Sequence, residues 1–350
     1  MNHNGLDLEV DHELFALVKA GYEVDLFTRG KVDMEGVKSS RPLINWSRLY
    51  SNFSSKLYYN KIQHFFDWAA SRRLKPGLYD VVVGWSGCAK KTFTQAKSLG
   101  IPTVLNAEIH HVDHNRVLHD MGLDCRRRRE EYGVADRIVV HSAFCKKTFT
   151  DKGVEDESIY VAHRGVDLEK FSCLSRENNQ VFRVVFFGRL CERKGIRQAI
   201  SAWKLANLDH AEFWMIGAID SSVKEDVESE LSDRVKYIPF TSTPEQYLVQ
   251  CDINLMPTES EGLAKSLVEA AACGLVTITT EESGFDLGEE NGVFHVERDN
   301  IHRTAELMKH FYQERSLCKS LGLCARNSVE KSFTWEQFHQ RFAQIVEESF

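Results

Sequence analysis

The interpretation of the fold turns on one stretch, Pro257-Thr258-Glu259-Ser260-Glu261-Gly262-Leu263-Ala264-Lys265-Ser266-Leu267-Val268-Glu269-Ala270-Ala271-Ala272-Cys273-Gly274. It follows the apolar run Ile253–Met256, which is short enough to be a buried strand. The small and apolar side chains up to Cys273 predict a tightly packed helix, and Gly274 can end it, because glycine adopts the left-handed conformation common at helix C-termini. A buried strand, a loop and a packed helix form the repeating unit of an α/β domain with a parallel sheet.

The same alternation of apolar runs and helical stretches continues along the chain in both directions. Besides Ile253–Met256, the predicted strands are Tyr22–Phe27, Asp80–Gly84, Thr103–Leu105, Arg137–Ser142, Arg183–Phe187, Glu212–Ile216, Val235–Ile238 and Val276–Thr279. Apolar residues at helical spacing predict helices around Leu14–Val18 and over Lys56–Trp68, and Ser142 begins another. The predicted fold class is α/β with parallel sheets.

A length of 350 residues favours two domains, each large enough to bury its own core. The polar stretch 172–180 is the best candidate for the linker between them. We expect an N-terminal domain over 1–172, a C-terminal domain over 181–332, and a closing helix within 333–350. That helix, which Thr334 can cap, is expected to pack back toward the first domain.

The start of the N-terminal domain departs from the usual pattern. A Rossmann-like domain normally opens with a buried strand and a glycine-rich turn. The chain instead begins at or just before its first helix, so either this strand is lost or residues 1–10 replace it poorly. We therefore expect an N-terminal domain that lacks its first strand.

Composition and charge argue against several classes of protein. The chain has 43% hydrophobic residues, 27% charged residues and a formal net charge of −7, which is unlike a disordered chain and does not favour nucleic acid as a partner. No apolar run is long enough to span a bilayer, and the first residues lack a signal-peptide pattern. Nine scattered cysteines without a Cys-x-x-Cys pair argue against a zinc site and fit reduced thiols. We expect a cytoplasmic protein.

The loop after the strand Arg183–Phe187 carries the first candidate site residues. Gly188 ends the strand, and the cations Arg189 and Lys194 follow five residues apart. Loops at the carboxyl ends of parallel strands face the ligand crevice, and a diphosphate bound there needs fixed positive charge. The alternative interpretation is a solvated basic loop.

The stretch that follows Ile253–Met256 carries the second group. Glu261 falls in the turn before the predicted helix, and Glu269 falls on the helix. The backbone N–H groups of Gly262, Leu263 and Ala264 are expected to point at an anion, helped by the helix dipole. Carboxylates accept pairs of sugar hydroxyls, which suits Glu261 to a hexose and Glu269 to a ribose. The alternative is a capped amphipathic helix with two surface glutamates.

Two further segments follow predicted strands. Ile238 and Phe240 are expected near the base of a bound nucleotide, at the end of the strand Val235–Ile238. Ser86 and Gly87, after the strand Asp80–Gly84, form a plausible acceptor loop.

Histidines and arginines in the first half give two more candidates. His110 and His111 follow the strand Thr103–Leu105, and a histidine there can donate to a sugar hydroxyl; a loop of solvated histidines is the alternative. The run Arg126–Arg129 precedes two glutamates. It is interpreted first as a solvated helix face paired with its own glutamates, and second as a contact with a membrane surface or an anionic acceptor.

Taken in order, these segments resemble the GT-B retaining glycosyltransferases of the glycosyltransferase family 4 type. The most specific elements are Gly188-Arg189-x4-Lys194-Gly195 and Glu261-x7-Glu269, and the segments Ala135–Ser142 and Gly165–Phe171 also occur in the family's usual order. The resemblance covers nearly the whole chain, from Leu14 to Trp335. It implies two Rossmann-like domains whose parallel sheets face each other across a cleft.

The resemblance also implies roles for the candidate residues. Arg189 and Lys194 would hold the donor diphosphate and stabilise the leaving nucleotide. Glu261 would bind the transferred sugar, and Glu269 the ribose. A histidine of the first domain lies beside the sugar in the family, and either His110 or His111 could match it. The chemistry agrees, because breaking a glycosyl–phosphate bond builds negative charge that preorganised cations and amides stabilise.

No Asp-x-Asp sequence occurs, which removes the usual metal-binding motif of the other major glycosyltransferase fold. We therefore expect no metal and no cofactor apart from the nucleoside-diphosphate sugar, which is a co-substrate. Two departures from the family stand out. Ala264 replaces a common glycine, and the glycine-rich loop that normally reaches the diphosphate from the first domain is missing with the first strand.

The expected reaction is transfer of a hexose from a nucleoside-diphosphate sugar to a hydroxyl of a glycan, a lipid or a small molecule. Front-face transfer with retention is expected, because the first domain offers no convincing carboxylate nucleophile. Two other functions fit the same residues: a related GT-B nucleotide-sugar epimerase, and a degenerate nucleotide-sugar-binding protein without catalysis. The sequence does not specify the base, the sugar or the acceptor.

Overall fold

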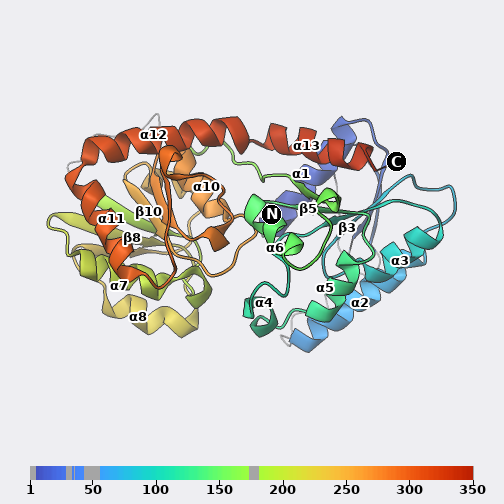
Figure 1. The fold of residues 1–350 in the computed structure, drawn as a ribbon, viewed down its shortest axis with the longest axis horizontal. Coiled ribbons are helices and arrows are strands. Elements are labelled where there is room, and N and C mark those ends of the chain that lie inside the picture. The colour runs from blue at the N-terminus through green and yellow to red at the C-terminus, as the bar shows by residue number, and fades with distance from the viewer. Residues whose placement is uncertain (1–4, 29–33, 35, 43–55, 173–180, 350) are drawn as a thin grey trace. The chain divides into compact units, whose positions relative to one another are not determined.

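The computed structural model describes residues 5–28, 34, 36–42, 56–172 and 181–349 (Figure 1). The chain divides into two compact units: unit 1 comprises Met1–Ala162 and Glu336–Phe350, and unit 2 comprises His163–Trp335. This division falls before the predicted domain end at residue 172, because Val166 and Phe171 are buried in the core of unit 2. Residues 173–180 of the predicted linker lie outside the described residues.

Unit 1 is built around a parallel sheet with the strand order β3-β4-β5-β6. Its strands are β3 Val82–Trp85, β4 Thr103–Asn106, β5 Arg137–Val140 and β6 Ile159–Val161. A second, two-stranded parallel sheet pairs β1 Val24–Thr28 with β2 Val37–Pro42. The helices before the second unit are α1 Gly5–Lys19, α2 Lys56–Ser71, α3 Lys90–Ser98, α4 Val117–Asp120, α5 Cys125–Tyr132 and α6 Ala143–Thr150.

The four strands predicted for this unit are present, as β1, β3, β4 and β5, and their ends differ from the predicted ones by at most two residues. The sequence analysis missed β2 and β6. Within the described residues, α1 comes before any strand. The predicted helix near Ser142 is α6, which this residue caps by accepting a hydrogen bond from Cys145 N at 3.1 Å.

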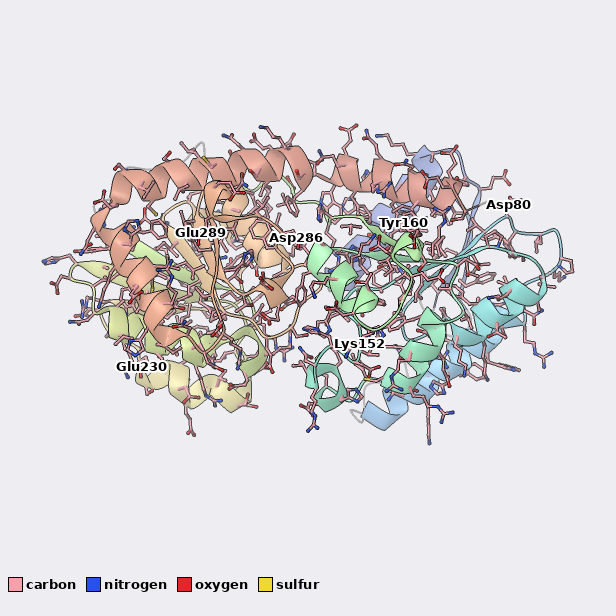
Figure 2. All side chains as sticks on the ribbon, viewed as in Figure 1. Asp80, Lys152, Tyr160, Glu230, Asp286 and Glu289 are labelled. Atoms are coloured by element: carbon pink, nitrogen blue, oxygen red, sulfur yellow. The ribbon has the colours of Figure 1, made fainter. Side chains whose placement is uncertain are left out.

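The last helix, α13 Trp335–Glu347, belongs to unit 1 from Glu336 onward and lies beside α1 (Figure 1). His339 Nε2 is 3.0 Å from His12 Nδ1 of α1. The Tyr160 ring, labelled in Figure 2, lies within cation–π distance of the guanidinium groups of Arg137 and Arg341. The chain therefore returns to its first unit after completing the second.

Unit 2 contains a parallel sheet with the strand order β12-β11-β10-β7-β8-β9. Its strands are β7 Phe182–Phe187, β8 Ala211–Ile216, β9 Val235–Ile238, β10 Ile253–Met256, β11 Val276–Thr279 and β12 Val293–His295. Its helices are α7 Ile196–Ala206, α8 Lys224–Ser229, α9 Glu245–Leu248, α10 Lys265–Ala272, α11 Ile301–Gln313 and α12 Arg315–Ser332. The five predicted strands of this unit are present, and the three-residue β12 was missed.

The stretch that decided the fold behaves as predicted. All four residues of β10 are buried, and α10 is buried along Leu267, Val268 and the three alanines that end it. Small side chains let this helix approach the sheet closely. Gly274, with φ of +79°, follows the helix in the left-handed conformation.

Candidate active site

Two glycines shape the loop after β7. Gly188 has a φ of +140° and Gly195 a φ of +77°, which other residues rarely adopt. A Cβ on Gly195 would lie 2.1 Å from the backbone oxygen of Pro257, so only glycine allows this loop to approach the loop after β10. Because β7 and β10 are parallel neighbours, both loops leave the same edge of the sheet.

The close approach of these loops brings Lys194 to Glu261. Lys194 Nζ is 3.1 Å from Glu261 Oε1, and Arg193 Nη1 is 2.7 Å from the same oxygen. Arg193 also donates to the backbone oxygen of Ser260. The side chains of Lys194 and Glu261 are only 14% and 16% exposed, so the loop is not a solvated basic segment at this point. The sequence analysis predicted two members of this cluster and did not single out Arg193.

The electrostatic environment keeps Glu261 ionised. Burial by itself raises the pKa of this carboxyl, but the positive charges of Lys194 and Arg193 and their hydrogen bonds outweigh burial. The pKa of Glu261 therefore lies below its ordinary value, and the carboxylate is a fixed acceptor surrounded by donors.

Arg189 lies apart from this cluster. Its Nε is 2.5 Å from Asp220 Oδ1, and its side chain is 66% exposed. The structure thus brings Lys194, but not Arg189, to Glu261. Its contact with Asp220 uses only Nε, so the other guanidinium N–H groups of Arg189 are the ones that a phosphate could meet.

The N-terminus of α10 borders the same region. Its N-cap residue, Ala264, forms no side-chain capping hydrogen bond. A Cβ on Gly188 would lie 3.5 Å from both Ser266 Oγ and Lys194 Nζ, so these two polar atoms face one small space beside the glycine. This arrangement places a cation, a hydroxyl and a helix N-terminus together, as anion sites in proteins do.

One predicted anion contact is wrong. The amide of Ala264 donates to the backbone oxygen of Ser283 at 2.9 Å, so it does not point at a ligand. The physical reason is the 3₁₀ turn Glu281–Ser283 after β11, whose carbonyl groups pair with the loop; its Glu282 oxygen likewise accepts from Glu261 N. For Gly262 and Leu263, the predicted contact stays a prediction.

Glu269 lies on α10, with its side chain 12% exposed and its Oε1 3.6 Å from Lys265 Nζ. Burial raises the pKa of this carboxyl, against the opposing charges of Lys265 and Lys170. Since Glu261 and Glu269 are both largely buried, the alternative of two surface glutamates is wrong.

The two residues predicted near a base lie in different surroundings. Ile238, at the end of β9, packs partly buried against the core of unit 2, and its backbone oxygen accepts from Gly217 N at 3.0 Å. Phe240 is 79% exposed, which is unusual for a phenylalanine side chain.

In unit 1, side chains of α5 form hydrogen bonds with the Ser86–Gly87 loop. Gly87 N donates to Glu131 Oε2 at 2.5 Å, and the Gly87 oxygen accepts from Arg127 Nε at 2.9 Å. Arg128 Nη1 donates to Ser86 Oγ at 3.1 Å. The candidate acceptor loop is therefore tied to α5, and its shape depends on side chains about 40 residues further along the chain.

The arginine run is not a single solvated face, although the predicted pairing with its own glutamates is present in Arg126–Glu130 and Arg127–Glu131. The contact with a membrane surface or an anionic acceptor stays a prediction. Arg127 and Arg128 are each 4% exposed, and Arg127 forms a buried ion pair with Asp67 of α2. Arg126 is 85% exposed and pairs with Glu130 of its own helix. Only the outer members of the run reach solvent, because α5 turns its middle arginines into the unit.

Neither predicted histidine is solvated. His110 is fully buried and its Nδ1 is 2.9 Å from the backbone oxygen of His111, so Nδ1 carries the proton. His111 packs against the rings of Tyr132 and Phe149, and its Nδ1 accepts from Asp113 N at 3.1 Å. Burial lowers the pKa of His111 to about 4, so this ring is neutral near pH 7. The alternative of a solvated histidine loop is wrong.

Across the described ranges, no three His, Cys, Asp or Glu side chains are grouped closely enough to hold a metal ion. The cysteines that the structure describes are free thiols. Of the helices in the described part of the chain, none combines the length and the apolar character needed to cross a bilayer.

Two sequence families match the chain. Residues 10–170 match "Glycosyltransferase Family 4" and residues 181–314 match "Glycosyl transferases group 1". The two matches lie end to end and follow the order of the two units.

Comparisons with individual proteins agree with the two family matches. The chain is 30% identical over 212 residues to the amylovoran biosynthesis glycosyltransferase AmsK of Erwinia amylovora; the match spans 56% of this chain and only 52% of AmsK. Sucrose-phosphate synthase from Thermosynechococcus elongatus has a similar fold, with a TM-score of 0.78 at 17% identity, over 99% of this chain and 93% of that one. Anabaena HepE in complex with UDP and glucose has a TM-score of 0.62 at 17% identity, over 77% and 78% of the two chains.

Proposed function

Because the chain belongs to the GT-B glycosyltransferases of the glycosyltransferase family 4 type, we propose that it transfers a hexose from a nucleoside-diphosphate sugar to a hydroxyl acceptor. The observation that carries the proposal is the largely buried pair of Lys194 and Glu261 beside the uncapped N-terminus of α10. A buried cation next to a helix N-terminus suits a diphosphate, and a fixed carboxylate beside it suits sugar hydroxyls. The complex of HepE with UDP and glucose supports the choice of donor class.

In the proposed reaction, the bond between the anomeric carbon and the phosphate oxygen breaks, and the acceptor oxygen bonds to that carbon on the same face. Negative charge grows on the leaving diphosphate, and Lys194, together with the exposed Arg189, would stabilise it. The acceptor proton leaves with the departing phosphate or passes to solvent. We propose that these cations make the reaction independent of a metal ion.

The remaining roles follow from position. We assign Glu261 to the transferred sugar and Glu269 to the ribose, with Phe240, an exposed ring, stacking on the base. Either His110 or His111 would be the sugar-side histidine, since both rings are buried, His110 at 0% and His111 at 5% exposure. Unit 1, through the Ser86–Gly87 loop, would bind the acceptor.

The test is product analysis with a donor labelled in its sugar, supplied with a panel of hydroxyl acceptors. The proposal predicts a new labelled glycoside with retained anomeric configuration. An epimerised donor, or donor binding without any turnover across the panel, would contradict transferase activity and point to the two other functions.

A further inference from the structure

Three residues of α2 and the residue that follows it form a stripe of unusual composition on its solvent side. Lys61, Phe65, Trp68 and Arg72 are spaced by four, three and four positions, so they lie on one face of the helix and of the turn that follows it. Phe65 is 45% exposed and Trp68 is 42% exposed, and their ring centroids are 5.5 Å apart. We call these four residues the α2 stripe.

The opposite face of α2 packs the helix against the rest of the unit. Asp67, Ala70 and Leu74 are buried there, and Asp67 accepts from the amides of Lys91 and Thr92 at 2.6 and 2.8 Å. This face joins α2 to α3, and the Asp67–Arg127 pair joins it to α5 (Figure 1). The two exposed rings are therefore not required for packing within the unit.

The charged side chains that this segment itself exposes are positive, and Asp124, an acid supplied by another part of the unit, is engaged by His64 Nε2 at 2.9 Å. Lys61, Arg72 and Lys75 are exposed, and Arg72 lies over the Trp68 ring at 5.8 Å. Between residues 60 and 75 the only acidic residue is Asp67, which is fully buried. This local excess of positive charge stands out in a chain whose formal net charge is −7.

We propose that the α2 stripe docks on the surface of an anionic lipid bilayer. The two rings would lie at the headgroup level, where amphipathic aromatic side chains are stable, and the flanking cations would face lipid phosphates. Charge complementarity favours this partner, because each lysine or arginine near an anionic surface strengthens binding, and Lys61, Arg72 and Lys75 flank the two rings. The inference assigns an interaction surface and does not depend on the proposed reaction.

Sedimentation of the full chain with vesicles tests the proposal. The probes are vesicles of phosphatidylcholine alone and vesicles that also contain phosphatidylglycerol. We expect binding to the anionic vesicles only, with a decline at high salt, because screening weakens surface electrostatics. Lys61→Gln and Arg72→Gln should each lower the partition coefficient about fivefold. The double variant Phe65→Ser/Trp68→Ser should abolish binding.

Matched control variants lie on unit 2. Leu323→Ser replaces a leucine that is 53% exposed, and Lys309→Gln replaces an exposed lysine; neither should change vesicle binding. Circular dichroism of each variant checks that it folds. If the double ring variant does not fold, the two charge variants still test the proposal. Equal binding of the stripe variants and the wild type would overturn the proposal. Failure of the wild type to bind anionic vesicles would also overturn the proposal. The same holds if the rings instead mediate concentration-dependent self-association without vesicle binding.

Discussion

Lys194 and Glu261 form an ion pair of 3.1 Å although they come from loops after two different strands, β7 and β10. The pair exists because these strands are neighbours in a parallel sheet and Gly195 lets their loops touch. It places a cation and a carboxylate at the carboxyl edge of the sheet, where α/β proteins bind ligands. The account of this protein rests on that pair.

Arg193 is predicted to position Glu261. It donates to Glu261 Oε1 at 2.7 Å and to the Ser260 backbone, so it fixes both the carboxylate and its loop. Loss of a hydrogen bond to a charged group costs about 1.5–3 kcal/mol, so Arg193→Gln should lower kcat about tenfold or more. Arg193→Lys, which keeps the charge, should recover part of the loss. Steady-state kinetics measure both.

The control is Arg197→Gln, which removes an arginine of α7 that pairs with Glu192 and Asp226 outside this cluster. A double-mutant cycle with Glu261→Gln separates positioning from a general structural effect. If Arg193→Gln reduces kcat equally in the presence and absence of the Glu261 carboxylate, the positioning role is wrong.

Glu261 and Glu269 should differ in kinetics, because their proposed partners differ. The transferred sugar gains positive charge in the transition state, while the ribose does not change. Interactions that strengthen only in the transition state affect kcat, whereas uniform binding affects mainly KM. Glu261→Gln should therefore chiefly lower kcat, and Glu269→Gln should chiefly raise KM for the donor.

Binding of a free nucleoside diphosphate gives a second measurement for this pair. It should weaken in Glu269→Gln and stay nearly unchanged in Glu261→Gln, with Glu259→Gln as the control in the same loop. Equal weakening in both variants would refute the division between sugar and ribose. If both variants bind the nucleoside diphosphate and turn over the donor like the wild type, α10 has a structural role only.

The outcome for the site shows which features a sequence can predict. The order of Gly188, Lys194, Glu261 and Glu269 along predicted strands and loops was enough to place them at one sheet edge. Arg193 was overlooked because, among three consecutive charged residues, only the fold shows which side chain turns toward Glu261. The hydrogen bond from the Ala264 amide to Ser283 could not be predicted either, since Ser283 belongs to the turn after the next strand.

The arginine run of α5 shows a related limit. Spacing along the helix predicts pairing with glutamates four residues on, and Arg126 does pair with Glu130. The burial of Arg127 depends on Asp67, which is 60 residues away and unmarked by any local pattern. Short strands such as β6 and β12 were missed for a similar reason: three residues carry too little periodicity, and pairing with a neighbour defines them.

His111 should stay neutral down to about pH 4, because burial lowers its pKa to about 4 from an ordinary value of about 6.5. Between these values the unfolded chain binds a proton at this ring and the folded chain does not, so stability falls as the pH falls through this window. The full effect is on the order of 3 kcal/mol. NMR titration of the ring, assigned with His111→Gln, measures the pKa directly. A midpoint near 6.5 would contradict the buried, neutral histidine.

Transfer should be independent of metal ions, since the proposed site offers cations to the diphosphate and the sequence holds no Asp-x-Asp motif. Activity should persist in excess chelator at the level of untreated enzyme. A loss in chelator that magnesium or manganese restores would show that a metal ion carries the diphosphate charge.

The most direct measurement is calorimetric titration of the wild type and Lys194→Ala with a panel of nucleoside diphosphates. The account predicts that the wild type binds at least one of them and that Lys194→Ala weakens this binding; in kinetic assays the same variant should lose about 2–4 kcal/mol of transition-state stabilisation, the range of a preorganised charge stabiliser. Arg189→Ala should weaken it too, whereas Lys204→Ala, which removes a lysine of α7 that pairs with Glu230 outside the cluster, should not. Failure of the wild type to bind any nucleoside diphosphate, or equal affinity of Lys194→Ala and the wild type, would contradict the claim that this cluster holds the donor.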